Sequence, residues 1–179
     1  MKYISLLRGI NVSGQKKIKM LDLKSLYESL GFVNVVTYIQ SGNVIFESDN
    51  KNIAKLKSQI EDTIEGKFKF DVPVEIRKKS EVTTIITNNP LGPINLETDS
   101  TRVLVTFLAA KPNKDKLADL LSYVSLPNKM LISGKEIYLY CPNGYGKSKL
   151  TNNFIEKKLG VVATTRNWKS VLKLHELSS

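Results

Sequence analysis

The stretch RGINVSGQKKIKM, residues 8–20, combines residue types that suit the binding of an anion. Its two glycines allow positive φ angles and a close approach of the backbone to a ligand. Arg8 stands at the end of a predicted strand. Lys16, Lys17 and Lys19 lead into a predicted helix start, where cations oppose the helix dipole and are poor structural choices. A bound anion would remove that conflict, so the stretch predicts an anion-binding loop. The alternative is a solvated basic loop.

A second stretch, NGYGKSKL at residues 143–150, lies between a predicted strand and a predicted helix. Its GKS ends like the phosphate-binding pattern G-x-x-x-x-G-K-[ST], but Cys141 stands where that pattern needs its first glycine, so the pattern is incomplete. The glycines, the helix-start N–H groups and Lys147 still suit an anion. The alternative is a glycine turn before a helix that Ser148 or Thr151 caps.

A third stretch, TTRNW at residues 164–168, places an arginine near an aromatic side chain at a predicted strand-to-helix junction. Arg166 suits a phosphate, and Trp168 suits stacking on a base. The alternative is structural, with Asn167 capping the terminal helix and Trp168 packing in the core. The sole histidine, His175, suits the end of that helix and needs no catalytic role.

Signatures of covalent or metal chemistry are missing from the chain. There is no G-x-S-x-G motif, and one cysteine and one histidine cannot form a metal framework of the usual spacing. We therefore predict no metal and no cofactor, and no catalytic residue is assigned. No apolar run approaches the roughly 18 residues of a membrane span, so we expect no membrane partner and a cytoplasmic location.

The overall charge favours a negatively charged partner. The formal net charge is +10, with 14 basic and 10 acidic residues in positions 1–90 and 13 and 7 in positions 91–179. A basic protein without an isolated basic tail favours nucleic acid, phosphorylated small molecules or acidic surfaces as partners. The alternative is that the lysines only keep the protein soluble. Because base-reading aromatics are few, any nucleic-acid binding is expected to be electrostatic and tolerant of sequence.

The hydrophobic pattern predicts the elements that position these stretches. In the first half, apolar runs and helical spacing predict a strand at 3–9, a helix at 19–32, a hairpin at 33–48, a helix at 52–65 and a strand at 72–79, followed by a short helix at 80–87. After a Pro/Gly-rich link, the same order is predicted again: a strand at 102–110, a helix at 114–124, a hairpin at 129–141, a helix at 148–159, a strand at 161–165 and a terminal helix.

The repeated order predicts an α+β protein of two ferredoxin-like β-α-β-β-α-β units with an extra C-terminal helix. The predicted boundaries are 1–88 for the first unit with its short helix, 89–100 for a linker and 101–179 for the second unit. The first and third strands of each unit are expected to be parallel neighbours. On that expectation, RGINVSGQKK and ESDNKN share one end of the first sheet, and AAKPNK and CPNGYGKSK share one end of the second.

Four separated motifs, LLRGINVSGQKKIKM, YIQSGNVIF, NGYGKSKL and ATTRNW, resemble the bacterial family known as domain of unknown function 1697. The resemblance extends over nearly the whole chain and implies the same duplicated α+β architecture. It implies no activity, because none is established for the family. The positions that match the family's pattern are Arg8, Gly9, Asn11, Gly14, Ser41, Gly42, Asn43, Gly144, Tyr145, Gly146, Thr165, Arg166, Asn167 and Trp168.

Three functional hypotheses remain open on the sequence. The first is a binding module for a phosphate-bearing ligand, either a nucleotide or nucleic acid. The second is an enzyme that acts on a small phosphorylated or acidic metabolite. In that case polar side chains would orient the substrate through hydrogen bonds. The third is a protein-interaction module. The predicted ligand-binding residues are Arg8, Asn11, Lys16, Lys17, Ser41, Asn43, Tyr145, Lys147, Arg166, Asn167 and Trp168.

Overall fold

The computed structural model describes residues 1–179, and the chain divides into two compact units. The first comprises Met1–Thr83 with Leu174–Ser179, and the second comprises Thr84–Lys173. The sequence places the boundary in a linker at 89–100, whereas the contacts divide the chain within the short helix that precedes this linker. The α+β class is confirmed, because each unit holds a four-stranded antiparallel sheet with helices packed against it.

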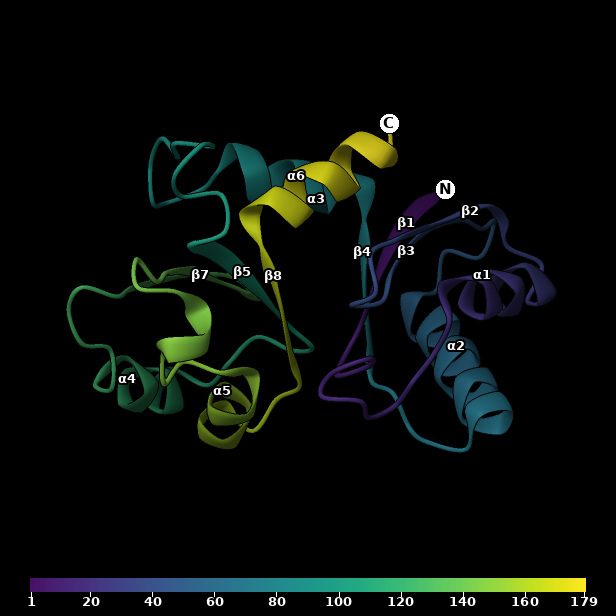
Figure 1. Ribbon diagram of the computed structural model, residues 1–179, viewed down its shortest axis with the longest axis horizontal. Helices are drawn as coiled ribbons and strands as arrows, with labels where there is room; N and C mark the ends of the chain where they lie inside the picture. The colour runs from purple at the N-terminus through teal and green to yellow at the C-terminus, as the bar shows by residue number, and fades with distance from the viewer. The chain divides into compact units, whose positions relative to one another are not determined.

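The first unit follows the predicted order of elements. It consists of β1 (Lys2–Leu7), α1 (Met20–Ser29), β2 (Val33–Tyr38), β3 (Asn43–Glu47), α2 (Ile53–Phe68), β4 (Val74–Lys78) and the start of α3 (Lys79–Thr87). The strand order is β2-β3-β1-β4. Helices α1 and α2 cover one face of this sheet (Figure 1). One face of α2 is buried against the sheet, with Leu56, Ile60 and Ile64 fully inside.

The second unit repeats that order. It consists of β5 (Val103–Leu108), α4 (Lys114–Leu121), β6 (Lys129–Ser133), β7 (Glu136–Tyr140), the short 3₁₀ turn η1 (Tyr145–Lys147), α5 (Asn152–Leu159), β8 (Ala163–Asn167) and most of α6 (Trp168–Leu177). The strand order is β6-β7-β5-β8, which is the order of the first sheet. Helices α4 and α5 lie side by side against this sheet (Figure 1).

The same kind of side-chain contact occurs within each unit, at an edge strand of its sheet. Glu61 in α2 accepts a hydrogen bond from the backbone N–H of Val74 at 2.8 Å, where β4 begins. Glu156 in α5 accepts one from the N–H of Ala163 at 3.0 Å, where β8 begins. Because an edge strand leaves such donors unpaired, each glutamate satisfies a group that would otherwise need water. The units therefore repeat a local detail as well as an order of elements.

The predicted pairing of the first and third strands as parallel neighbours is wrong. β1 and β3 are neighbours, but they run antiparallel, with Tyr3 opposite Phe46. The same holds for β5 and β7. The reason is that β3 follows β2 through a tight hairpin and so reverses its direction. The loops after the first and third strands of each unit therefore leave from opposite ends of the sheet and do not share an end.

The loop after β1 instead meets the β2–β3 turn and the start of β4. The N–H of Leu7 donates to the carbonyl of Gly42 at 2.8 Å, and the N–H of Arg8 donates to the carbonyl of Pro73 at 2.8 Å. The motif around residues 8–20 thus lies beside the motif around residues 38–46. In the second unit, the loop after β7 lies where β5 begins, and the N–H of Cys141 donates to the carbonyl of Arg102 at 2.8 Å.

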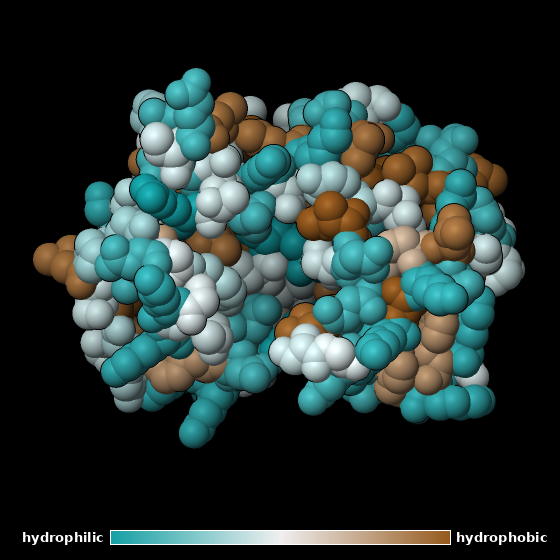
Figure 2. All heavy atoms as spheres, viewed as in Figure 1, coloured by the Kyte–Doolittle hydropathy of each residue, from teal (hydrophilic) through white to brown (hydrophobic).

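The visible surface is mostly polar (Figure 2). Figure 2 shows a mostly hydrophilic face on which hydrophobic side chains form scattered groups, as expected for a chain with 27 lysines and arginines. None of the helices combines the length and the apolar character that crossing a bilayer requires.

Gly42 allows the two motifs of the first unit to approach each other. Its φ is +79°, in the region that disfavours residues with a Cβ. A Cβ at this position would lie 2.6 Å from Cδ1 of Ile10 and 2.8 Å from Cβ of Leu7. Both neighbours are buried, so neither can move aside cheaply.

We therefore expect Gly42→Ala to lower the free energy of unfolding by about 2–4 kcal/mol, from left-handed backbone strain plus overpacking. Gly31→Ala is the matched control, because Gly31 has a φ of +81° and a Cβ added there would meet no atom within 4 Å. It should cost only about 1 kcal/mol. Denaturant unfolding of both variants measures the difference, and equal losses would show that close packing at Gly42 does not matter.

Candidate functional site

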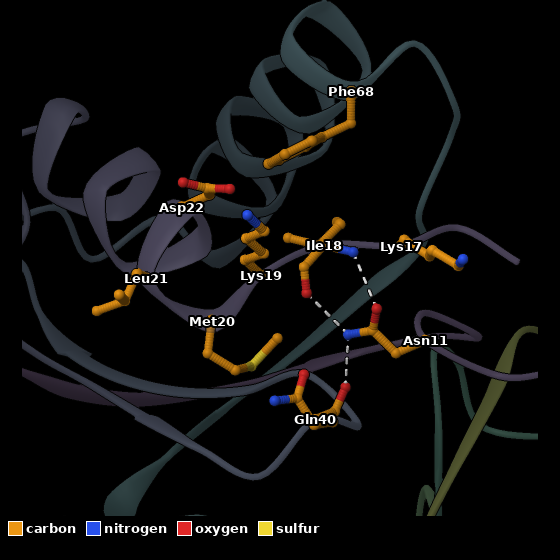
Figure 3. A pocket seen from close by; sticks show the side chains of 9 residues that line it. All are labelled: Asn11, Lys17, Ile18, Lys19, Met20, Leu21, Asp22, Gln40 and Phe68. Atoms are coloured by element: carbon orange, nitrogen blue, oxygen red, sulfur yellow. Dashed lines mark hydrogen bonds between the residues drawn. The ribbon is translucent and has the colours of Figure 1, made fainter. Parts of the chain in front are cut away.

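A pocket of about 690 Å³ opens in the first unit where the loop after β1 enters α1 (Figure 3). The loop, the first turn of α1, the β2–β3 turn and the end of α2 all contribute to its wall. The side chains around it are Asn11, Lys17, Ile18, Lys19, Met20, Leu21, Asp22, Gln40 and Phe68. The wall thus combines ammonium groups, amides and one carboxylate with an apolar surface, which is the composition of a ligand pocket.

Asn11 holds the loop in place. Its Oδ1 accepts from the N–H of Ile18 at 2.9 Å, and its Nδ2 donates to the carbonyls of Ile18 at 2.9 Å and Gln40 at 2.8 Å. Figure 3 shows these three bonds joining the loop to the β2–β3 turn. The Asn11 backbone has a φ of +55°, a left-handed conformation that asparagine tolerates better than most residues. Asn11, predicted as a ligand group, thus bonds to the chain itself.

The loop between Asn11 and Ile18 is compact and unusual in its backbone. Ser13 and Lys16 also have positive φ angles, of +50° and +45°. The N–H of Asn11 donates to the carbonyl of Lys16 at 3.2 Å, which closes the loop on itself. The Lys16 ammonium donates to the carbonyl of Asp71 at 2.6 Å and lies 3.6 Å from its carboxylate. Lys16 therefore ties the loop to the segment before β4 and does not line the pocket.

The pocket is electropositive. Lys17 and Lys19 are exposed, and neither ammonium makes a hydrogen bond or an ion pair with the chain. Lys67 adds a third cation nearby, since its ammonium lies 3.4 Å from the Asp22 carbonyl and 5.5 Å from the centre of the Phe68 ring. The Asp22 carboxylate is the one negative group in the wall. Three ammonium groups near one carboxylate give the pocket an excess of positive charge.

The N-terminus of α1 adds to this potential. The residue at its N-cap position is Lys19, and no side chain accepts a hydrogen bond from the first-turn N–H groups. Helices α2, α4 and α5 are instead capped by the side chains of Asn52, Asn113 and Thr151. The first-turn N–H groups of α1 therefore remain available beside the pocket, where the helix dipole favours an anion.

Three more predicted residues of the first unit lie near this end of the sheet. Asn43 is fully buried at the start of β3, and its Nδ2 donates to the Tyr38 carbonyl at 2.9 Å and to Ser41 Oγ at 3.0 Å. These bonds shape the β2–β3 turn that carries Gln40. Arg8 is half-buried where β1 ends. None of the three lines the pocket.

The predicted residues of the second unit hold that unit together. Trp168 is 4% exposed, and Asn167 Oδ1 accepts from the N–H of Ser170 at 2.8 Å at the start of α6. Both observations match the structural alternative from the sequence, in which Asn167 caps the terminal helix and Trp168 packs in the core. Arg166 is also buried and donates to the Thr165 carbonyl at 2.9 Å. Tyr145 donates to Thr165 Oγ1 at 3.4 Å, which joins the third and fourth motifs.

Lys147 is the predicted residue of the second unit that faces a hollow. It lines a pocket of about 330 Å³ at the end of the sheet where β7 finishes. The helix that follows is capped by Thr151, as the alternative interpretation of this stretch expected.

The structure therefore brings two of the predicted residues, Asn11 and Lys17, into the first pocket. The predicted ligand-binding residues did not include Lys19, Gln40 or Phe68, which also line the pocket. Lys19 belonged to the basic run that the sequence placed before the helix, and the structure puts it at the N-cap position. Gln40 and Phe68 carried no such signal, since only the fold brings the turn and the end of α2 to α1.

The side chains give no support for covalent or metal chemistry. Cys141 is buried, and burial raises the pKa of its thiol, which disfavours the thiolate. No three His, Cys, Asp or Glu side chains gather closely enough to hold a metal ion. The arrangement suits binding through charge and hydrogen bonds.

Comparison with known proteins identifies the family. The profile of the family described as "Protein of unknown function (DUF1697)" matches residues 1–138, more than three quarters of the chain, so the chain belongs to that family. The matched range includes the first two motifs and ends before the other two. None of the curated proteins matches the chain.

The fold is similar to that of a solved structure described as conserved bacterial protein SP0830 from Streptococcus pneumoniae. The two share 20% sequence identity and superpose with a TM-score of 0.77 over 99% of this chain and 98% of the other. At that identity the likeness establishes the fold alone.

The bonds of Asn11 generate a prediction for the pocket. Asn11→Asp retains the acceptor for the Ile18 N–H but removes both bonds to carbonyls and places negative charge against them. We expect a loss of about 1–3 kcal/mol in unfolding free energy, together with faster amide hydrogen exchange at Ile18. Gln15→Glu, an exposed position of the same loop, is the isosteric control and should change neither value. Equal behaviour of the two variants would show that Asn11 does not hold the loop.

Proposed function

We propose that this member of the DUF1697 family binds a phosphate-bearing small molecule, with a nucleotide as the best-fitting class, in the pocket at the start of α1. The observation that carries the proposal is the pair of unpartnered lysines, Lys17 and Lys19, beside the uncapped N-terminus of α1. Cations at the positive end of a helix are destabilising without an anion. A phosphate group would accept hydrogen bonds from both lysines and from the first-turn N–H groups.

The rest of the wall favours a ligand with an apolar or planar part. In Figure 3 the Phe68 ring extends from the end of α2 toward the Ile18–Lys19 segment. Ile18 and Met20 add aliphatic surface. A base can pack against an aromatic ring and aliphatic side chains while its phosphate stays at the lysines. The volume of about 690 Å³ lies within the range of small-molecule sites.

A concave pocket favours a nucleotide over an extended polynucleotide, which needs a continuous basic face. The proposal also places the protein in the cytoplasm, where its single thiol would stay reduced.

Removing one lysine at a time tests the proposal. We expect phosphate, AMP or ATP at millimolar concentration to raise the melting temperature of the wild-type protein, because a ligand that binds only the folded state stabilises it. Lys19→Gln and Lys17→Gln should each weaken nucleotide affinity by about tenfold, the effect of one charge-assisted hydrogen bond. Titration calorimetry measures the affinities.

Lys51→Gln is the matched control, because Lys51 is exposed in the same unit and does not line the pocket. It should bind nucleotides as the wild type does. The proposal fails if no ligand stabilises the wild type, or if all three variants lose affinity equally. Tight binding of short oligonucleotides that falls steeply with salt, without binding of mononucleotides, would identify nucleic acid as the ligand instead.

A further inference from the structure

We propose that the second unit carries a separate binding site for a small anion that also bears hydroxyl groups, a phosphorylated polyol being the fitting class. The site is the hollow of about 330 Å³ at the end of the sheet where β7 finishes. It is lined by Asn128, Asn143, Gly144, Lys147 and Ser148. The proposal is independent of the pocket at α1, because no residue lines both.

The antiparallel hairpin brings the polar side chains of this hollow together. Lys129 at the start of β6 lies opposite Tyr140 at the end of β7. Asn128, which precedes β6, and the loop at 141–151, which follows β7, therefore lie at the same end of the sheet. Residues distant in the sequence thus supply one concave surface, and polar groups that converge in a hollow are the usual mark of a binding site.

Three of the four side chains that line the hollow have unused hydrogen-bonding capacity, whereas Ser148 Oγ accepts a hydrogen bond from the N–H of Leu150 at 3.0 Å. The carboxamides of Asn128 and Asn143 and the ammonium of Lys147 make no hydrogen bond or ion pair with the chain. Other asparagines of the protein are engaged, for example Asn52 and Asn113 as helix caps. Each free carboxamide offers two donors and one acceptor, and the ammonium offers three donors.

The loop that carries these groups is held by its own hydrogen bonds. The N–H of Gly144 donates to the Cys141 carbonyl at 2.9 Å, and the N–H of Lys147 donates to the Gly144 carbonyl at 3.2 Å. The N–H of Ser148 donates to the Tyr145 carbonyl at 2.9 Å. A loop fixed in this way loses little conformational freedom when a ligand binds, so its polar groups are preorganised.

The composition of the wall defines the ligand. Lys147 is the only ionised group in it, so it would meet an anion such as a phosphate. The two carboxamides would exchange hydrogen bonds with hydroxyl groups, which are also both donors and acceptors. The wall contains no aromatic ring for a base, and its volume of 330 Å³ is less than half of the 690 Å³ at α1. These features favour a small polyol phosphate over a nucleotide.

An NMR titration with glycerol 3-phosphate tests the site directly. We expect shifts of the side-chain amide signals of Asn128 and Asn143 and of the backbone signals of Gly144 and Gly146. Lys147→Gln should weaken this binding by about tenfold or more. Lys149→Gln is the matched control, because Lys149 is exposed in the same loop and does not line the hollow. It should bind as the wild type does. The same spectra report whether each variant is folded.

Two reference compounds measure the contributions of the anionic group and of the hydroxyl groups to binding separately. Inorganic phosphate and glycerol should each bind more weakly than glycerol 3-phosphate. Phosphate lacks the hydroxyl groups of the polyol, and glycerol lacks the anionic group. Lys19→Gln, which alters the pocket at α1, should leave the titration unchanged, so this proposal is tested separately from the nucleotide site. Equal binding by Lys147→Gln and Lys149→Gln, no shift at the two asparagines, or equal affinity for glycerol 3-phosphate and either reference compound would overturn the proposal.

Discussion

The antiparallel pairing of β1 with β3 determines which loops of the first unit can meet. Because the two strands run in opposite directions, the end of β1 lies beside the start of β3 and beside the turn that precedes it. The backbone bonds from Leu7 to Gly42 and from Arg8 to Pro73 lock this arrangement. The junction between the loop after β1 and the β2–β3 turn follows from it, since Asn11 could not otherwise bond to Gln40.

The loop after β1 is ordered by side chains at its base. Three non-glycine residues between positions 11 and 16 have left-handed backbones, each of which costs about 1 kcal/mol for an ordinary residue. Asn11 offsets that cost with three hydrogen bonds, and Lys16 adds a bond to Asp71. With Asn11 and Lys16 engaged in this way, Lys17 and Lys19 remain as the loop's unpartnered cations. The backbone conformation of the loop therefore decides which of its lysines bond to the chain and which stay unpartnered.

The sequence predicted the elements well because each has a local cause. The stripe of Leu56, Ile60 and Ile64 predicts α2 from its spacing, and the structure buries all three. The structural alternatives for Asn167 and Trp168 also came from local patterns. The relation between the loops needed the topology of the whole sheet, because β3 reverses its direction after the predicted hairpin and then inserts beside β1. Phe68 belongs to the pocket only through the packing of α2, which no local pattern encodes.

The two units place their long loops at opposite ends of the same fold. In the first unit twelve residues, 8–19, join β1 to α1, and five, 48–52, join β3 to α2. In the second unit five residues, 109–113, join β5 to α4, and eleven, 141–151, join β7 to α5. The short connections end in side-chain caps, Asn52 and Asn113, and contribute no residue to either hollow. Each of these two hollows lies at a long loop, and loops on a rigid scaffold commonly carry binding groups. The two units therefore share one fold but present different surfaces, because each has lengthened a different one of its strand-to-helix connections.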